Sequence, residues 1–309
     1  MIRMTISIVI LIWLFSRIDI GAVFSAFSKI SWPAWAGAFA LYLFSQVLSS
    51  LRWFIIGRTL GFGGTFMTYI KFYFVGMYFN LFLPSAIGGD VLKAFFLARH
   101  GAGKLKATYS ILSDRLFGLW GMFIIGAIAS LSSVHSLPGK WRHLLFFLAL
   151  SMTGAAMAVP FFTKAINSLG ARLVTKQKIL TKMLLALEYM VAFWRHPSSL
   201  FYALGLSILL QLCGMTGAYI LGKALGIALE YCFYLSVLPL IAVLTVLPIS
   251  FSGIGVREGG FIFFFHMKGV PMEKAVALSL SVFAIQAAAA LIGGIGYLAG
   301  VHRQAISEK

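Results

Sequence analysis

The sequence predicts an all-α polytopic membrane protein with an inverted internal repeat, and three observations support this prediction. The 309 residues are 61% hydrophobic and only 11% charged, whereas a soluble domain carries about 25% charged residues. Apolar runs of membrane-spanning length recur along the chain. A proline–glycine break followed by a basic residue occurs once in each half. We therefore expect residues 1–309 to form a single membrane domain.

Six apolar runs are of roughly the length that crosses a bilayer, for which a helix needs about 20 residues. The first run resembles a signal peptide, but the Ser-Arg-Ile-Asp stretch after it offers no small-residue cleavage site. We therefore expect a retained span there. The six predicted spans are 2–16, 34–56, 107–132, 143–162, 198–222 and 272–300.

Two further apolar runs, 66–84 and 231–250, end at a proline followed by glycines. The apolar stretches after these breaks, 90–98 and 256–267, reach only about half way across a membrane at 1.5 Å per residue. A short helix after such a break favours a re-entrant hairpin that returns to its own face. The predicted units are repeat one, 34–132 with hairpin 66–98, and repeat two, 198–301 with hairpin 231–267.

The distribution of basic residues predicts the orientation. The connector 164–197 is strongly basic and has apolar residues at helical spacing, which favours an amphipathic helix on the cytoplasmic surface over a plain polar linker. Both termini then become cytoplasmic, and the cytoplasmic loops hold about twice as many basic residues as the outer loops. This scheme treats Arg52 as a span end and 17–33 as an outer loop. The first hairpin enters from the cytoplasm and the second from outside, so the repeat is inverted.

Composition also excludes several classes of function. The net charge of +17 is explained by basic loops that flank spans and meet anionic lipid, so nucleic acid is not an expected partner. The six histidines show no metal-ligand spacing, and we expect neither a metal nor a cofactor. Gly253, Gly255 and Gly259 imitate a dinucleotide-binding fingerprint but lack the βαβ context that it requires.

Few ionisable residues fall at membrane depth, where charge is costly, and these are the candidates for function. In both repeats a basic residue stands nine positions after a proline, Lys93 after Pro84 and Arg257 after Pro248. If each hairpin turns at its break, these cations lie within the first turn of the returning helices. Helix starts attract anions through free N–H groups and the helix dipole. Two such starts that meet from opposite faces would form a central cationic pocket suited to a phosphate.

The neighbouring charges leave several roles open. Asp90 is either a pocket acid or a first-turn acid that complements the helix dipole. Glu258 is either a pocket acid or the partner of a basic residue of the other hairpin, for example Lys93. Proton coupling through either acid is a third option. Asp114 and Arg115 are adjacent and do not face each other on a helix, so we expect one or both to pair with other groups.

Four stretches, 79–84, 88–90, 113–116 and 253–259, together resemble the membrane region of lysylphosphatidylglycerol synthases. Leu51-Arg52-Trp53 is similar as well. The resemblance covers nearly the whole chain, and the family includes stand-alone bacterial inner-membrane proteins of flippase-like type. It implies a stand-alone, multi-pass protein of a bacterial or archaeal cytoplasmic membrane. Because the soluble synthase domain is missing from this sequence, its enzymatic activity is not carried over.

The resemblance implies a flippase or scramblase that moves a phospholipid or other anionic-headgroup lipid between leaflets by alternating access. Two positions depart from the family pattern: Lys93 replaces an expected arginine, which weakens bidentate phosphate recognition, and Phe283 replaces an expected polar or basic residue. Asn80 is expected to close backbone hydrogen bonds near the break or to bind the ligand. The predicted substrate-binding residues are Asn80, Pro84, Gly88, Gly89, Asp90, Lys93, Asp114 and Arg115 in repeat one, and Gly253, Gly255, Arg257 and Glu258 in repeat two.

Other functions compete with lipid movement. A membrane-embedded lipid-modifying enzyme, such as a polyprenyl-linked glycosyltransferase, usually needs acids or metal ligands at an aqueous face, and the predicted outer loops 17–33 and 133–142 offer only Asp19. A non-transporting partner of a lipid-modifying enzyme would dock through the connector 164–197. A small-ion or solute transporter could use the same repeat. The sequence contains no Walker motif, so lipid movement would be downhill or ion-coupled.

Overall fold

The structure, a computed structural model, describes residues 18–83, 88–101, 103–132, 137–170, 189, 191–246 and 253–298, with α7 side chains described as far as Phe161. Within these ranges every regular element is a helix, and five helices are long and apolar enough to cross a membrane. They confirm five of the six predicted spans, whereas 2–16 lies outside the described residues. The five are α3 (Trp32–Thr59), α6 (Lys104–Ser132), α7 (Gly139–Gly170), α9 (Pro197–Ala224) and α12 (Met272–Gly296).

Two regions differ from the predicted organisation. Residues 17–33, expected to be a loop, contain the short helix α2 (Ile20–Ser28). Its N-cap is Asp19, whose carboxylate accepts hydrogen bonds from Gly21 N at 2.8 Å and Ala22 N at 3.2 Å. The second difference is that α7 continues past the predicted end at 162 to Gly170. Most of the connector predicted over 164–197 lies outside the described residues, so the amphipathic helix stays a prediction.

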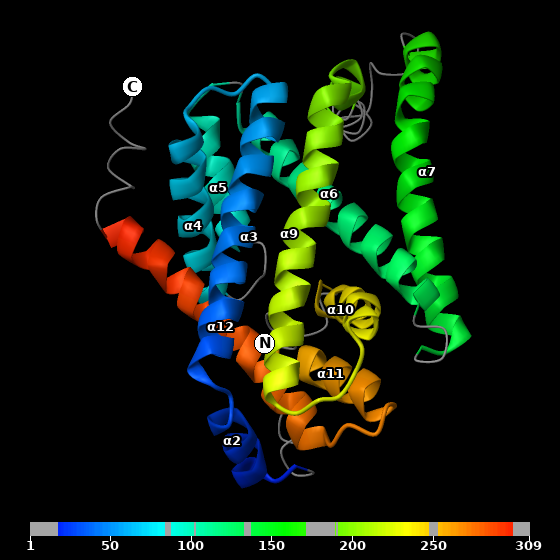
Figure 1. Cartoon of the computed structure of the whole chain (residues 1–309). Coiled ribbons are helices and arrows are strands. Elements are labelled where there is room, and N and C mark those ends of the chain that lie inside the picture. The colour runs from blue at the N-terminus through cyan, green and yellow to red at the C-terminus, as the bar shows by residue number, and fades with distance from the viewer. Residues whose placement is uncertain are drawn as a thin grey trace.

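Four shorter helices occupy the predicted hairpin regions: α4 (Phe66–Phe82), α5 (Gly88–Ala98), α10 (Tyr231–Val246) and α11 (Val256–His266). α4 packs against α5, and α10 against α11. In the first pair, Gly63 N donates to His100 O at 3.3 Å where α4 begins and α5 ends. Gly89 N donates to Asn80 Oδ1 at 2.8 Å beside the break. The two helices are therefore antiparallel. Figure 1 places α4 and α5 toward one end of the molecule and α10 and α11 toward the other.

The long helices pack closely where small residues meet. α3 and α9 run side by side through the centre of the bundle, and α6 crosses α9 (Figure 1). A Cβ placed on Gly121 of α6 would lie only 2.8 Å from the Cβ of Ser207 on α9. A Cβ on Gly293 of α12 would overlap the Phe74 carbonyl of α4. These contacts bring backbones together in the manner typical of membrane helices.

One local arrangement occurs in both halves. α3 ends in a Schellman cap in which Phe62 N donates to Gly57 O at 2.9 Å. Tyr69 of the next helix packs on Gly57 so closely that a Cβ there would overlap its hydroxyl. In α9 and α10, Gly222 and Tyr234 repeat the same cap and the same contact. The spacing in the sequence is also the same: Gly222, Ile227 and Tyr234 lie at the same intervals from one another as Gly57, Phe62 and Tyr69.

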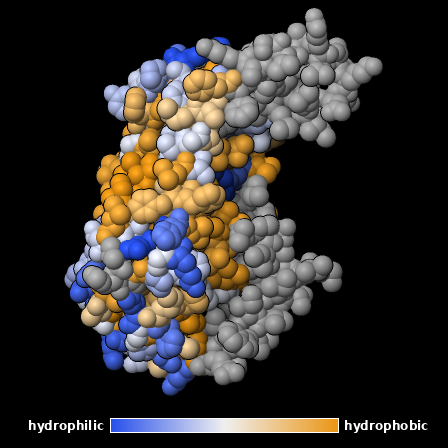
Figure 2. Space-filling model, turned by 90° about the vertical axis from the view of Figure 1, so that its right-hand side faces the viewer, coloured by the Kyte–Doolittle hydropathy of each residue, from blue (hydrophilic) through white to orange (hydrophobic). Residues whose placement is uncertain are grey.

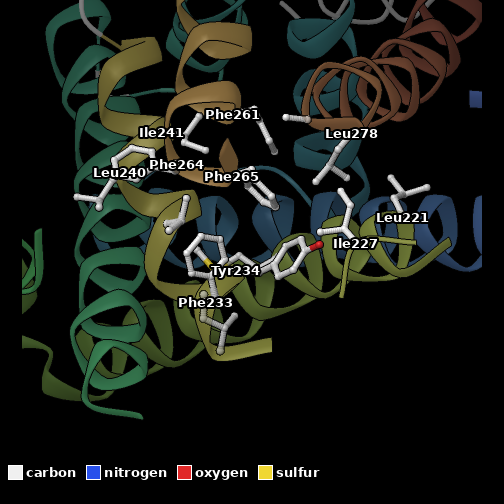
Figure 3. Close-up of a cluster of buried hydrophobic side chains, with 14 of the residues drawn as sticks. Leu221, Ile227, Phe233, Tyr234, Leu240, Ile241, Phe261, Phe264, Phe265 and Leu278 are labelled. Atoms are coloured by element: carbon white, nitrogen blue, oxygen red, sulfur yellow. The ribbon is translucent and has the colours of Figure 1, made fainter. Parts of the chain in front are cut away.

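Apolar clusters surround the two helix pairs. The cluster around α10 and α11 contains an aromatic group in which the Phe265 ring lies 5.5 Å from Phe233 and 5.2 Å from Tyr234, both edge to face (Figure 3). A second cluster joins Trp53 and Tyr69 to α5 and α6. Figure 2 shows hydrophobic residues across the middle of one face, with hydrophilic residues at its upper edge and over its lower part. This surface is suited to a lipid environment.

Candidate functional site

A cluster of three charges, two of them buried, joins α5 to α6. Asp90 and Lys93 lie one turn apart on α5, with Lys93 Nζ 2.7 Å from Asp90 Oδ1. Arg115 of α6 donates from Nε to the other carboxylate oxygen of Asp90. The pairing of Arg115 with Asp90 confirms the expectation that the adjacent Asp114 and Arg115 pair with other groups. We call Asp90, Lys93 and Arg115 the first-half cluster. With two cations and one anion it carries a net positive charge.

The two cations of the first-half cluster have different surroundings. The Lys93 ammonium lies 4.5 Å from the ring centre of Tyr73 and 5.7 Å from that of Trp53, and its side chain is only 9% exposed. The Arg115 side chain is 41% exposed. Because α5 begins at Gly88, Lys93 lies in its second turn and not in the predicted first turn. Arg115 is therefore the more exposed of the two cations, while the aromatic rings of Tyr73 and Trp53 pack around Lys93.

Arg115 also lies near the middle of the long apolar helix α6. It is about 17 Å along α6 from Lys104 at 1.5 Å per residue, in a helix of 29 residues. The hydrocarbon core of a bilayer is about 30 Å thick, so this position falls near its middle when α6 spans it. An exposed guanidinium at that depth is expected to face water or a polar ligand, since contact with lipid chains is costly.

The break beside the first-half cluster depends on glycines and one amide. Asn80 accepts the hydrogen bond from Gly89 N, which is the backbone-closing role that the sequence suggested. A Cβ on Gly89 would overlap the Gly76 carbonyl of α4, and one on Gly88 would collide with Leu83. These two glycines therefore let α5 approach α4. Pro84 lies outside the described residues.

The second-half cluster consists of Arg257 and Glu258 of α11 and Ser279 of α12. Glu258 Oε1 accepts from Arg257 Nη2 at 2.5 Å and from Ser279 Oγ at 3.2 Å. Glu258 Oε2 accepts from Gly255 N at 2.7 Å and so caps the start of α11. The suggested pairing of Glu258 with Lys93 is wrong, because each residue pairs within its own half. The second-half cluster is neutral and nearly enclosed, with Glu258 side-chain exposure of 2%.

Backbone geometry explains the glycines of this motif. Gly253 and Gly255 have φ angles of 77° and 85°, which glycine adopts without strain. This conformation lets Gly255 N donate to the carboxylate of Glu258, which is three residues further on. The Arg257 guanidinium carbon lies 4.5 Å above the ring centre of Phe283. Phe283, a departure from the family pattern, thus packs against a cation through its ring face.

A third charged pair lies in the centre of the bundle. Arg52 of α3 contacts Asp114 of α6, with Arg52 Nε 2.7 Å from Asp114 Oδ1. Arg52 Nη1 donates to Ser207 Oγ of α9 at 2.9 Å. Both charged side chains are buried inside the bundle. We call Arg52, Asp114 and Ser207 the three-helix pair. The sequence had singled out Asp114 and the Leu51-Arg52-Trp53 stretch, whereas Ser207 gave no signal.

The structure thus divides the predicted site residues into separate groups. Asn80, Gly88 and Gly89 shape the break beside the first-half cluster, and Asp114 belongs to the three-helix pair. Gly253 and Gly255 position the second-half cluster. Within the part of the chain that the structure describes, no group of three or more His, Cys, Asp and Glu residues is placed to hold a metal ion.

The profile of a known family matches this chain over residues 1–294: the lysylphosphatidylglycerol synthase TM region. The chain belongs to this family. Comparison with curated proteins and with solved structures gives no match. The family describes the transmembrane part of the synthases and not their catalytic part. Membership agrees with the five apolar spans and makes this chain a membrane protein of the lysylphosphatidylglycerol synthase TM family.

Proposed function

We propose that this family member moves a lipid with an anionic headgroup between the two leaflets of a cytoplasmic membrane. The observation that carries the proposal is the first-half cluster: a net positive charge, at membrane depth, with one half-exposed arginine. A net charge at membrane depth is unfavourable unless water or a counter-ion reaches it. A phosphate diester carries one negative charge and would balance the cluster when it contacts Arg115.

The chemistry of the contact favours a phosphate. The Arg115 guanidinium has five N–H donors, and its Nε is directed to Asp90. Guanidinium groups recognise phosphates through paired hydrogen bonds. Asp90 fixes the orientation of Arg115, and Lys93 holds Asp90 from the other side. In this arrangement Lys93 acts through Asp90, and Arg115 is the residue expected to touch the headgroup.

We infer that α4–α5 and α10–α11 are re-entrant hairpins that enter from opposite faces of the membrane. α5 and α11 have 11 residues each, about 17 Å of helix, which is roughly half the hydrocarbon core. The antiparallel packing of α4 and α5, the positions of the two pairs toward opposite ends in Figure 1 and the repeated Schellman cap support an inverted repeat. Alternating access would then open the Arg115 region to each face in turn.

The orientation is tested by cysteine labelling. In a background with Cys213 and Cys232 replaced by alanine, single cysteines are introduced at Lys104, beside the first hairpin, and at Met267, beside the second. We expect an impermeant maleimide added outside the cell to label Met267→Cys, and Lys104→Cys to react only after the membrane is opened. Labelling of both positions from one side would contradict the inverted arrangement.

The function is tested by reconstituting the purified protein in liposomes with fluorescent phospholipids of one chain length and different headgroups. We expect phosphatidylglycerol to change leaflets faster than in protein-free liposomes and faster than phosphatidylcholine. Repeating the translocation assay with and without a pH gradient distinguishes downhill from proton-coupled lipid movement. If no lipid moves faster than in protein-free liposomes, the transport proposal is wrong. Enzymatic and partner functions would then be tested with labelled lipid donors.

A further inference from the structure

A cavity of about 440 Å³ lies between α6, α7 and the start of α9. Its walls come from Leu116, Phe117 and Trp120 of α6, from Met152 and Ala156 of α7, and from Phe193, which precedes α9. Sites for small ligands typically have volumes of about 300–1,000 Å³. The cavity is large enough for a ligand and is separate from the three charged groups described above.

The cavity wall is chemically apolar. Its two tryptophans direct their N–H groups into α7: Trp120 Nε1 donates to Thr153 Oγ1 at 2.9 Å, and Trp194 Nε1 donates to the Ala156 carbonyl at 3.1 Å. The Ser151 hydroxyl donates to Leu148 O at 3.0 Å. None of the described residues that line the cavity is charged. The wall therefore offers hydrocarbon and aromatic contacts and is not suited to a headgroup.

The position of the cavity favours a lipid chain as the ligand. Only 11% of the most apolar stretch of α7 is buried in the protein, against 67% for α6. Phe147, Leu150 and Phe161 of α7 are exposed apolar side chains, and Figure 1 shows α7 at the edge of the bundle. α7 thus forms the side of the cavity that lies at the lipid-facing edge of the bundle. Hydrocarbon chains are the molecules available there, and filling an apolar cavity gains dispersion contacts.

We propose that this cavity binds one acyl chain of a bilayer phospholipid. The cavity residues Ser113, Leu116, Phe117 and Trp120 recur at three- and four-residue spacing on one face of α6. Arg115 leaves α6 in a different direction, toward α5. The bound chain is therefore held apart from the headgroup site, and its binding does not depend on transport. Recognition is through the chain, so headgroups of different charge are accepted equally.

The test uses phospholipids with a photoreactive diazirine in the middle of one acyl chain, in vesicles that contain the full-length protein. After irradiation, mass spectrometry identifies the labelled residues. We expect labels on Met152 and Phe193 with both phosphatidylglycerol and phosphatidylcholine carriers. Ala156→Phe fills the cavity and should reduce this labelling about tenfold, the loss expected when two methylene groups are no longer buried. Ala158→Phe, on the same helix but outside the lining, should leave the labelling unchanged.

Ala155→Phe repeats the filling from a neighbouring position of the lining, so the test does not depend on the folding of one variant. Labelling confined to Phe147, Leu150 and other outward-facing residues of α7 would overturn the proposal, as would equal cavity labelling in Ala156→Phe and in the unmodified protein. Arg115→Gln should not change chain labelling. Failure of the acyl-chain site is therefore distinguishable from failure of the headgroup site.

Discussion

The two halves of the molecule share a framework but treat charge differently. Both have a helix with a Schellman cap, a tyrosine packed on a glycine, and a short helix after a proline–glycine break. In the first-half cluster one acid is shared by two cations, one of them half exposed. In the second-half cluster one acid and one cation neutralise each other. The two halves therefore have the same backbone arrangement, and their local charges determine which half attracts an anion.

This difference assigns separate roles to the two short helices. Glu258 has a structural role, since it accepts hydrogen bonds from Gly255 N, Arg257 and Ser279 and so ties the start of α11 to α12. Asp90 orients Arg115 across the contact between α5 and α6. Loss of a cation should therefore destabilise the second half, whereas in the first half it should mainly weaken binding of the anionic ligand. The predictions below test this contrast in order of decreasing effect on stability.

The largest effect is expected from Arg257→Met. Glu258 is buried, and Arg257 is the one cation beside it among the described residues. Removal of Arg257 therefore leaves an uncompensated charge and should destabilise the protein by about 3–5 kcal/mol. Arg115→Gln should cost less than about 1 kcal/mol, because Arg115 is half exposed and Asp90 keeps Lys93 as a partner. The measurement is thermal unfolding in detergent. If the double variant Arg257→Met/Glu258→Gln regains stability, the unpaired acid is the cause of the loss. Equal losses in Arg257→Met and Arg115→Gln would contradict the contrast between the two halves.

A smaller effect is expected from the glycines of the two short helices. Gly89→Ala should destabilise the first hairpin by about 1–3 kcal/mol, because its Cβ would overlap the Gly76 carbonyl. In the second half, no atom of the described residues lies within 4 Å of a Cβ placed on Gly259. Gly259→Ala should therefore leave stability unchanged or raise it by up to about 1 kcal/mol. Protease resistance in detergent measures both, and equal sensitivity would show that the close approach in α4–α5 is not needed.

The spans and helix-pair boundaries could be predicted from sequence because they depend on local properties. Five apolar runs appear as helices, and all but the C-terminal end of α7 lie within a few residues of the predicted ends. α4 and α10 begin at the predicted positions 66 and 231. Helix α2 was missed because nine residues are too few for a hydropathy signal of a span. The repeated Schellman caps were also missed, since their sequence signal is one glycine after each helix.

The charge partners were harder to predict because they depend on tertiary packing. Arg52 lies near the end of an apolar run, and only the crossing of α3, α6 and α9 buries it against Asp114 and Ser207. Adjacent residues of a regular helix point apart, yet Arg257 and Glu258 form an ion pair. Their pairing occurs at the first turn of α11, where Glu258 also caps Gly255 N. Sequence spacing identified the ionisable residues but not their partners.

The smallest effect is expected from the two matched tyrosines. The Tyr69 hydroxyl donates to Gly63 O at 3.4 Å, so Tyr69→Phe should cost up to about 1 kcal/mol. The Tyr234 hydroxyl is buried without a hydrogen-bond partner among the described residues. Tyr234→Phe should therefore leave stability unchanged or raise it slightly. Thermal unfolding of the two variants in one detergent compares them, and a larger loss for Tyr234→Phe would show that its hydroxyl has a partner after all.

The ratio of phosphatidylglycerol to phosphatidylcholine translocation in liposomes tests the central claim most directly. It is measured for the unmodified protein, Arg115→Gln, Arg115→Lys and Arg58→Gln, the last an exposed arginine of α3 outside the clusters. Loss of one charged contact should lower the ratio about tenfold in Arg115→Gln, equivalent to about 1.4 kcal/mol. We expect Arg115→Lys to keep part of the preference and Arg58→Gln all of it. An unchanged ratio in folded Arg115→Gln would show that the first-half cluster does not bind the headgroup.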